Sequence, residues 1–157
     1  MRLAAVLDTL QNSAVAHAIS KSDHLVGATL QVVHIFGIVL LLSSLVLVSL
    51  RLLGWLLPEA PLSVVAREGR RFFRIGVTLA VVSGTLIFIA TAKLYGTKWI
   101  FGLKMVLFAA AVAIHVLLLS RVLRQEQPSP AAARTAAALS LVLWFGVGFA
   151  GRMIGFA

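Results

Sequence analysis

Two basic side chains lie inside apolar stretches of this chain, and their types make them the first candidates for chemistry. His34 falls within residues 25–50 and Lys104 within residues 99–120. An ionisable group at membrane depth is costly, so it usually faces a bundle interior, a partner or a cavity. A neutral imidazole can ligate a metal or carry a proton, and an ammonium can hold an anion or a carbonyl oxygen. We therefore predict a functional site at His34 and Lys104, with His34 as the candidate metal ligand.

Four apolar stretches must position these groups. Each has close to the ~20 residues that a helix needs to cross a bilayer, and they cover residues 25–50, 75–92, 99–120 and 136–156. Since backbone groups in lipid must bond within their own segment, these stretches predict helices. We expect an all-α fold, an integral membrane four-helix bundle that forms a single transmembrane domain over residues 1–157. Before the first stretch, apolar residues at helical spacing predict a short amphipathic N-terminal helix over residues 3–19 that lies in the membrane interface.

Composition supports a membrane protein and excludes several other classes. The chain is 61% hydrophobic and 12% charged, and a soluble domain of 157 residues could not hide that much apolar surface. The absence of cysteine excludes iron–sulfur clusters and thiolate zinc sites within this chain. A net charge of +9 would suggest nucleic acid for a soluble protein, but here the arginines fall between the apolar stretches. They are expected to contact lipid headgroups, so we predict a lipid bilayer and no nucleic acid as partner.

The distribution of basic residues predicts an orientation. Eight Lys and Arg flank the first and third loops, and these are Arg51, Arg67, Arg70, Arg71, Arg74, Arg121, Arg124 and Arg134. Five flank the termini and the second loop, and these are Arg2, Lys21, Lys93, Lys98 and Arg152. The positive-inside rule then places the first and third loops in the cytoplasm and both termini on the opposite, outer side.

Helix rise converts sequence position into depth and brings several polar residues to one level. Measured from the outer surface, His34 lies about 13 Å deep, Thr85 roughly 12 Å, Lys104 about 8 Å and Arg152 about 6 Å. Gln31 lies one turn above His34 on the same helix face. Independent anchors need not coincide in this way, so we predict one polar site in the outer half of the membrane.

His115 is the other histidine at membrane depth. It lies about 24 Å below the outer surface, which is about 11 Å deeper than His34. Both axial ligands of one haem must lie at nearly the same depth, so this offset disfavours a haem held between His34 and His115.

Each candidate also has a purely structural interpretation. His34 would then be a neutral histidine that hydrogen-bonds a carbonyl or Thr85. Lys104 would extend towards the outer headgroups, and Arg152 would be an interfacial anchor. His115 would be a polar packing residue between helices. Glycines in the last stretch, among them Gly146, Gly148, Gly151 and Gly155, would serve close helix packing, or else leave room for a flat cofactor or a second copy of the chain.

Short segments in a fixed order carry a resemblance. They are Ile19-Ser20, residues 34–37, residues 50–54, residues 83–88, Ala92 with Tyr95, Phe101 with Lys104-Met105, Trp144, and Gly151-Arg152. Their order and spacing resemble a large bacterial family of short four-helix inner-membrane proteins without an assigned function. The resemblance implies a multi-pass protein of the bacterial inner membrane. In such a membrane, the orientation predicted from the basic residues places the termini on the periplasmic side. Many such sequences have asparagine where this chain has His115.

A more distant likeness of layout is to the HemJ type of protoporphyrinogen oxidase and to the membrane domain of copper resistance protein D. The HemJ type has a histidine on its first span and a lysine on a later one, which His34 and Lys104 match. This likeness implies haem or porphyrin chemistry by analogy of layout only.

Two functions follow as hypotheses. In the first, the outer site binds haem b, a porphyrin or a quinone for electron transfer, with His34 as axial ligand or proton carrier and Lys104 and Arg152 holding propionates or a quinone carbonyl. In the second, the chain is a non-enzymatic accessory or assembly subunit of a membrane complex, whose glycine face docks a partner or a second copy. A small transporter is the least favoured function, because no acidic residue lies within any span.

Overall fold

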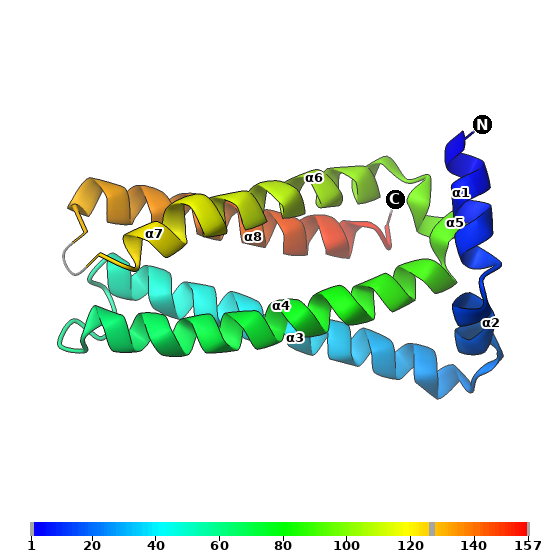
Figure 1. Ribbon diagram of the computed structural model, residues 1–157, viewed down its shortest axis with the longest axis horizontal. Helices are drawn as coiled ribbons and strands as arrows, with labels where there is room; N and C mark the ends of the chain where they lie inside the picture. The colour runs from blue at the N-terminus through cyan, green and yellow to red at the C-terminus, as the bar shows by residue number, and fades with distance from the viewer. Residues whose placement is uncertain (1, 126–127, 157) are drawn as a thin grey trace.

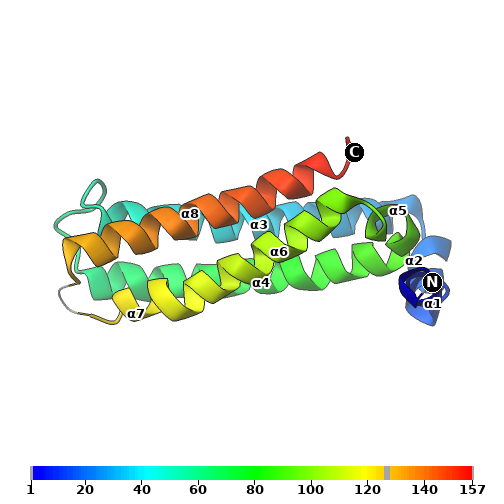
Figure 2. The same ribbon diagram turned by 90° about the horizontal axis from the view of Figure 1, so that it is seen from above.

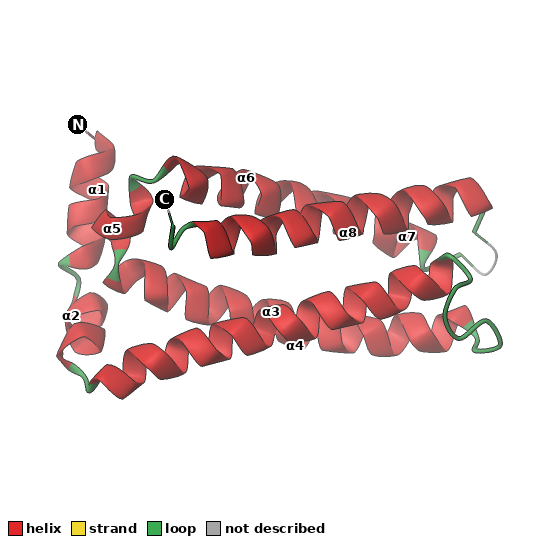
Figure 3. Cartoon of the chain, turned by 180° about the vertical axis from the view of Figure 1, so that it is seen from behind, coloured by secondary structure: helices red, strands yellow, loops and turns green. Residues whose placement is uncertain are grey.

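The chain folds as a bundle of long helices with short helices at one end. The computed structural model describes residues 2–125 and 128–156. The helices are α1 (Arg2–Gln11), α2 (Ala14–Lys21), α3 (His24–Leu52), α4 (Leu62–Ala90), α5 (Ala92–Gly96), α6 (Trp99–Ile114), the π-helix η1 (His115–Leu119), α7 (Ser120–Val122) and α8 (Pro130–Met153). Figure 3 shows helices and loops, and no strand, in this described part.

Four helical segments are long and apolar enough to cross a membrane. They are α3, α4, the continuous segment Trp99–Val122 formed by α6, η1 and α7, and α8. The predicted all-α fold with four apolar spans is therefore confirmed, and the chain is a multi-pass membrane protein.

The long helices pair as two hairpins. The first hairpin is α3 with α4, the second is α6 with α8, and the two hairpins form two layers (Figure 1). Seen from above, α8 runs along α3 (Figure 2). By contrast, no Cα of α4 lies within 8 Å of a Cα of α6. We call the end that carries both termini the terminal end, and the opposite end the loop end; the terminal end corresponds to the outer half predicted from the sequence.

Glycines set the spacing within the first hairpin. A Cβ at Gly76 would lie 2.6 Å from the backbone nitrogen of Leu41, and a Cβ at Gly37 would lie 2.7 Å from that of Ala80. Only glycine permits this approach of the two backbones. The α3–α4 hairpin is therefore the closest helix pair of the bundle along its middle.

The apolar core is concentrated at the loop end. It includes Leu41, Leu45 and Val48 of α3, Val65 and Ala66 of α4, Leu119 of η1, and Ala133, Ala136 and Trp144 of α8. A smaller cluster of Ile100, Ala150 and Ile154 joins only α6 to α8 near the terminal end. Consequently, the two hairpins share one core at the loop end. At the terminal end, α4 contacts α6 through the stacked rings of Phe88 and Phe101, whose centroids are 4.7 Å apart.

Helix α4 begins earlier than the apolar pattern predicts. It starts at Leu62 rather than near residue 75, so Arg67, Arg70, Arg71 and Arg74 lie on a helix and not in a loop. This part of α4 is amphipathic: Val65, Ala66 and Gly69 are buried, whereas Arg67, Arg71 and Arg74 are exposed. A pattern that seeks continuous apolar residues misses such a helix, because only one of its faces is apolar.

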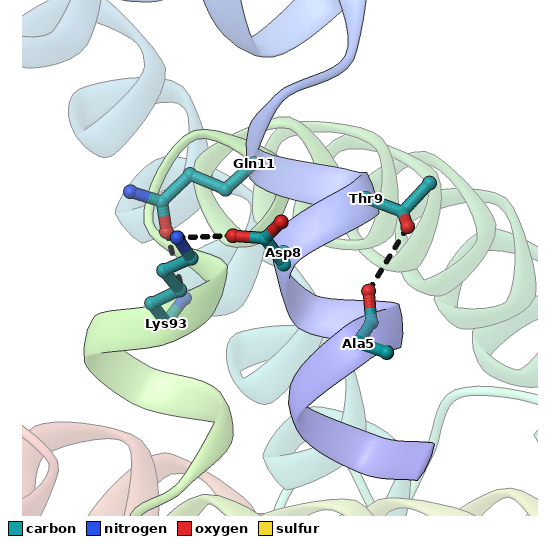
Figure 4. Close-up of polar contacts among 5 residues, drawn as sticks. All are labelled: Ala5, Asp8, Thr9, Gln11 and Lys93. Carbon is teal, nitrogen blue, oxygen red and sulfur yellow. Dashed lines mark hydrogen bonds and ion pairs between the residues drawn. The ribbon is translucent and has the colours of Figure 1, made fainter. Parts of the chain in front are cut away.

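The predicted N-terminal helix is two helices. Ser13 interrupts residues 3–19 and caps α2 by accepting a hydrogen bond from the backbone N–H of Ala16 at 3.3 Å. Helix α1 lies across the terminal end of the bundle (Figure 1). It is fastened to α5 through Lys93, whose ammonium pairs with Asp8 and whose backbone N–H donates to Gln11 Oε1 at 2.8 Å (Figure 4).

Candidate functional site

The histidine of the predicted site lies between the helices of the first hairpin. His34 Nδ1 is 2.8 Å from the backbone oxygen of Ala80 and 3.2 Å from Ser83 Oγ. A carbonyl oxygen only accepts, so Nδ1 carries the proton and donates it. The Ser83 hydroxyl in turn donates to the Leu79 carbonyl oxygen at 2.5 Å, which leaves its oxygen free to accept from His34.

This pairing determines which nitrogen of His34 is available. With the proton on Nδ1, the neutral ring has an unprotonated Nε2, and within the described residues Nε2 has no hydrogen-bond partner. A metal-ligating histidine usually donates its other ring N–H to a carbonyl or carboxylate in this way. His34 is half-buried, so its Nε2 has the form of a ligand or proton acceptor that is held in one orientation.

Glycine 84 makes room for the imidazole. A Cβ at Gly84 would lie 2.8 Å from His34 Cε1, which is closer than real Cβ contacts. Ala80, Ser83 and Gly84 are spaced by three and four residues, so they form one face of α4. On that face, the Ala80 carbonyl and the Ser83 hydroxyl contact the His34 ring, and Gly84 leaves the space that the ring occupies.

The lysine of the predicted site lies on the other hairpin. Lys104 is half-buried on α6 and extends over Gly151 of α8, where a Cβ would lie 3.3 Å from Nζ. Within the described residues its ammonium has neither an ion pair nor a hydrogen bond. The terminal end therefore places an unprotonated imidazole nitrogen and an unpaired cation on opposite hairpins.

Three other predicted site residues do not join this pair. Gln31 and Thr85 are exposed, and no hydrogen bond within the described residues connects either of them to His34 or Lys104. Arg152 is also exposed, and its guanidinium lies 4.6 Å from the centroid of the Phe156 ring. The structure thus pairs His34 with a carbonyl, as one structural interpretation expected, and with Ser83 instead of Thr85.

His115 lies in the other half of the bundle. Its ring stacks on Phe73 of α4, with centroids 3.8 Å apart and an angle of 6° between the planes. His34 contacts α4 at Ala80 and Ser83, seven to ten residues further along the same helix, which corresponds to roughly 10–15 Å of rise. The two histidines therefore do not face one ligand, which agrees with the depth argument from the sequence.

The donor set also limits the form in which a metal can bind. Within the described residues, no three side chains of His, Cys, Asp or Glu gather as a metal-binding group. A single imidazole is enough for a metal that arrives inside a macrocycle, since the macrocycle supplies most of the ligands. Among the described residues, the site thus offers one imidazole as a possible metal ligand.

Fold and site together define a multi-pass membrane protein with a histidine on one helical hairpin and a lysine on the other. A family model matches residues 10–157, and the chain belongs to that family, DUF6644, a family of unknown function. No curated protein and no solved structure matches the chain. The family membership agrees with the resemblance to an uncharacterised family seen in the sequence, and the likeness to the HemJ type remains a hypothesis about function.

Proposed function

We propose that this protein binds haem b between its two hairpins at the terminal end, with His34 Nε2 as an axial ligand. The observation that carries the proposal is the hydrogen bond from His34 Nδ1 to the Ala80 carbonyl, 2.8 Å long, which leaves Nε2 unprotonated. Such a second bond also orients the ring and raises the basicity of the ligating nitrogen.

Lys104 supplies the charge that a haem requires. The two propionates are anionic, and a charge-assisted hydrogen bond from an ammonium stabilises a carboxylate in a medium of low dielectric. Lys104 has no competing acidic partner within the described residues. One haem molecule would therefore satisfy both groups, with iron at Nε2 and a propionate at Nζ.

The corresponding activity is one-electron transfer within the membrane. A haem held by His34 would supply one-electron redox chemistry. The chain contributes the axial nitrogen, the fixed ring orientation from Ala80 and Ser83, and the counter-charge of Lys104. Because His115 lies in the other half, the monomer contributes one histidine and not two.

A haem titration tests the proposal. The apoprotein in detergent is titrated with haem, and wild type is compared with His34→Ala and with His17→Ala, whose exposed histidine lies on α2. We expect one equivalent of haem to bind wild type and His17→Ala, and His34→Ala to lose the specific spectrum. Equal spectra for all three proteins would show adventitious binding and contradict the proposal.

A quinone and its quinol are the second candidate ligand, and the same two groups favour them. The Lys104 ammonium can donate to a carbonyl oxygen of the quinone, and an unprotonated Nε2 can accept a hydroxyl proton of the quinol. A ubiquinone analogue would then raise the melting temperature of wild type and not of Lys104→Met, whereas haem would give no specific spectrum.

An accessory or assembly role is the alternative to cofactor binding. It is supported by the bonds that His34 already makes, since they tie α3 to α4 without any ligand. In that case a His34→Gln variant that still folds would retain all cellular function, and partners would be retained when the membrane complex is purified through wild-type protein.

We further propose that the protein lies in the bacterial inner membrane with both termini in the periplasm. The eight basic residues near the loop end, against five near the terminal end, support this orientation. Reporter fusions to the C-terminus test it: alkaline phosphatase should be active there and green fluorescent protein dark. The opposite pair of results would reverse the orientation and leave the haem proposal untouched.

A further inference from the structure

Four buried polar atoms of the loop end have no hydrogen-bond partner among the described residues. They are Ser49 Oγ of α3, His115 Nδ1 of η1, and Ser140 Oγ and Trp144 Nε1 of α8. Ser49 and Ser140 are fully buried, with 0% exposure, and Trp144 is 3% exposed. Buried polar groups are normally paired with protein or with ordered water, so four unpaired atoms in one half of a small bundle require an explanation.

Helix register brings these atoms to one level. Gly148 of α8 faces Leu42 of α3, so these two residues lie at a similar height along the bundle axis. Ser140 lies eight residues closer to the loop end on α8, and Ser49 lies seven residues closer to it on α3. At the rise of an α-helix, the two serines therefore differ in height by about 2 Å or less. Gly146 of α8 likewise faces Leu107 of α6. Ser140 lies six residues closer to the loop end than Gly146, and His115 lies eight residues closer to it than Leu107. Ser140 and His115 therefore differ in height by about 3 Å.

Trp144 belongs to the same group. It lies one turn from Ser140 on α8, and its ring packs edge-on against Phe73, which carries His115 on its face. The four atoms thus come from three helices, and all four lie in the half of the bundle that the shared apolar core occupies.

The backbone at His115 departs from a regular helix. Residues His115–Leu119 form a π-helix, and the Ser120 N–H bonds to the His115 carbonyl oxygen five residues back. A π-helix of one turn shifts the side chains on its two sides relative to each other, and such bulges occur often at functional sites. The π-helix begins at His115. Of the four unpaired groups, His115 is the one that can change its charge.

We propose that the loop end contains a buried water site formed by Ser49, Ser140, Trp144 and His115. The indole N–H only donates, the hydroxyls donate and accept, and the imidazole nitrogen can do either, which matches the mixed bonding of water. A cation is disfavoured because the indole N–H would point its hydrogen at it, and an apolar ligand would leave all four groups unpaired. The site would give His115 a hydrogen-bonded route for protons to two serines inside an otherwise apolar half.

Paired serine variants test the site, and the test does not depend on haem. We would measure melting temperatures in detergent for Ser49→Ala, Ser140→Ala and the double variant. If one water cluster joins the two hydroxyls, each single variant should melt lower by roughly 2–4 °C. The double variant should then lose clearly less than the sum, because the second change removes a partner of water already lost.

Ser44→Ala is the matched control. Ser44 is buried on the same helix as Ser49, but its hydroxyl donates to its own helix at the Leu41 carbonyl oxygen, 2.8 Å away. Its effect should add to that of Ser140→Ala without coupling. Single variants that melt at or above the wild-type temperature, with additive effects, would show a dry site and overturn the proposal. A rise in melting temperature on addition of chloride, lost in Ser140→Ala, would show an anion site and also overturn it.

Discussion

The two halves of this bundle contain similar polar residues in opposite circumstances. At the terminal end, His34 is paired with a backbone carbonyl across α3 and α4, and Lys104 stands on the other hairpin with no partner among the described residues. At the loop end, one core joins all four spans and encloses buried polar atoms that have no partner among the described residues. The shared apolar core is thus concentrated in one half of the bundle. In the other half the hairpins contact each other through the stacked rings of Phe88 and Phe101, and our proposed ligand site lies in that half.

The two histidines illustrate this difference most directly. His34 has its Nδ1 bonded and its Nε2 available, whereas His115 has its face covered by Phe73 and its Nδ1 buried without a partner. In our proposals, the same type of side chain therefore binds a large ligand in one half and water in the other.

The largest expected effect is a loss of stability at the close approach of α3 and α4. Gly76→Ala places a Cβ 2.6 Å from the Leu41 backbone nitrogen, so it should lower the free energy of unfolding by about 3 kcal/mol through overpacking. Thermal unfolding in detergent measures this. Gly102→Ala is the control, because a Cβ there meets nothing within 4 Å and alanine should stabilise the helix by up to about 1 kcal/mol. Equal behaviour of the two variants would show that the α3–α4 approach is looser than described.

The next effect should be confined to the terminal end. Gly84→Ala would push the His34 ring out of its place, since the new Cβ would lie 2.8 Å from Cε1. We expect haem affinity to fall on the order of 10–100-fold, as for other groups that orient a metal ligand. A haem titration measures the loss. An unchanged affinity would show that haem binding does not depend on the His34 ring position that Gly84 permits.

Lys104 should affect ligand binding and stability in opposite directions. Lys104→Met removes an unpaired charge from membrane depth, so the apoprotein should melt higher than wild type. The same change should weaken haem binding about tenfold, because a charge-assisted hydrogen bond to a propionate is lost. The exposed Arg152 provides the control, and Arg152→Met should change neither quantity. A lower melting temperature for Lys104→Met would mean that the ammonium stabilises the fold by itself.

The smallest effect concerns the helix that covers the terminal end. The Lys93 ammonium, by hydrogen bond and by charge, holds the pKa of the Asp8 carboxyl below its usual range. A lowered pKa means that this contact stabilises the fold fully above the unfolded pKa of about 3.9 and is lost as the pH falls through the folded value. Hydrogen exchange of residues 2–11 should therefore be faster in Asp8→Asn than in wild type near neutral pH. The two proteins should become alike once the pH has fallen below the folded pKa of Asp8, and a difference that persists after Asp8 is protonated would contradict the ion pair.

The sequence predicts the depth of a residue in the membrane better than the helix face on which the residue lies. Periodicity and length predicted the four spans, and helix rise brought His34 and Lys104 to neighbouring depths. Depth does not say which face of a helix a residue occupies: Thr85 is two residues from Ser83, about 200° around the helix, and so it points away from His34. The small residues Gly76, Ala80, Ser83 and Gly84 recur at three and four residue spacing, and this signal identifies the face that packs on α3.

Other features required the third dimension for different reasons. The first turns of α4 are amphipathic, so a search for apolar runs placed their arginines in a loop. Arg152 follows Gly151 by one residue, yet that 100° step takes it from the Lys104 side of α8 to an exposed position. The π-helix at His115 depends on tertiary packing and has no local sequence signature that we could use.

We have proposed that His34 at the terminal end, and not His115 at the loop end, holds a haem. The most direct test is the ultraviolet–visible spectrum of detergent-purified wild type, His34→Ala and His115→Ala, each expressed with added haem and recorded oxidised and then reduced with dithionite. We expect a Soret band in wild type and in His115→Ala, with bands that sharpen on reduction. We expect no such band in His34→Ala protein that still unfolds cooperatively. A flat wild-type spectrum, or an unchanged band in His34→Ala, would show that His34 does not hold a haem.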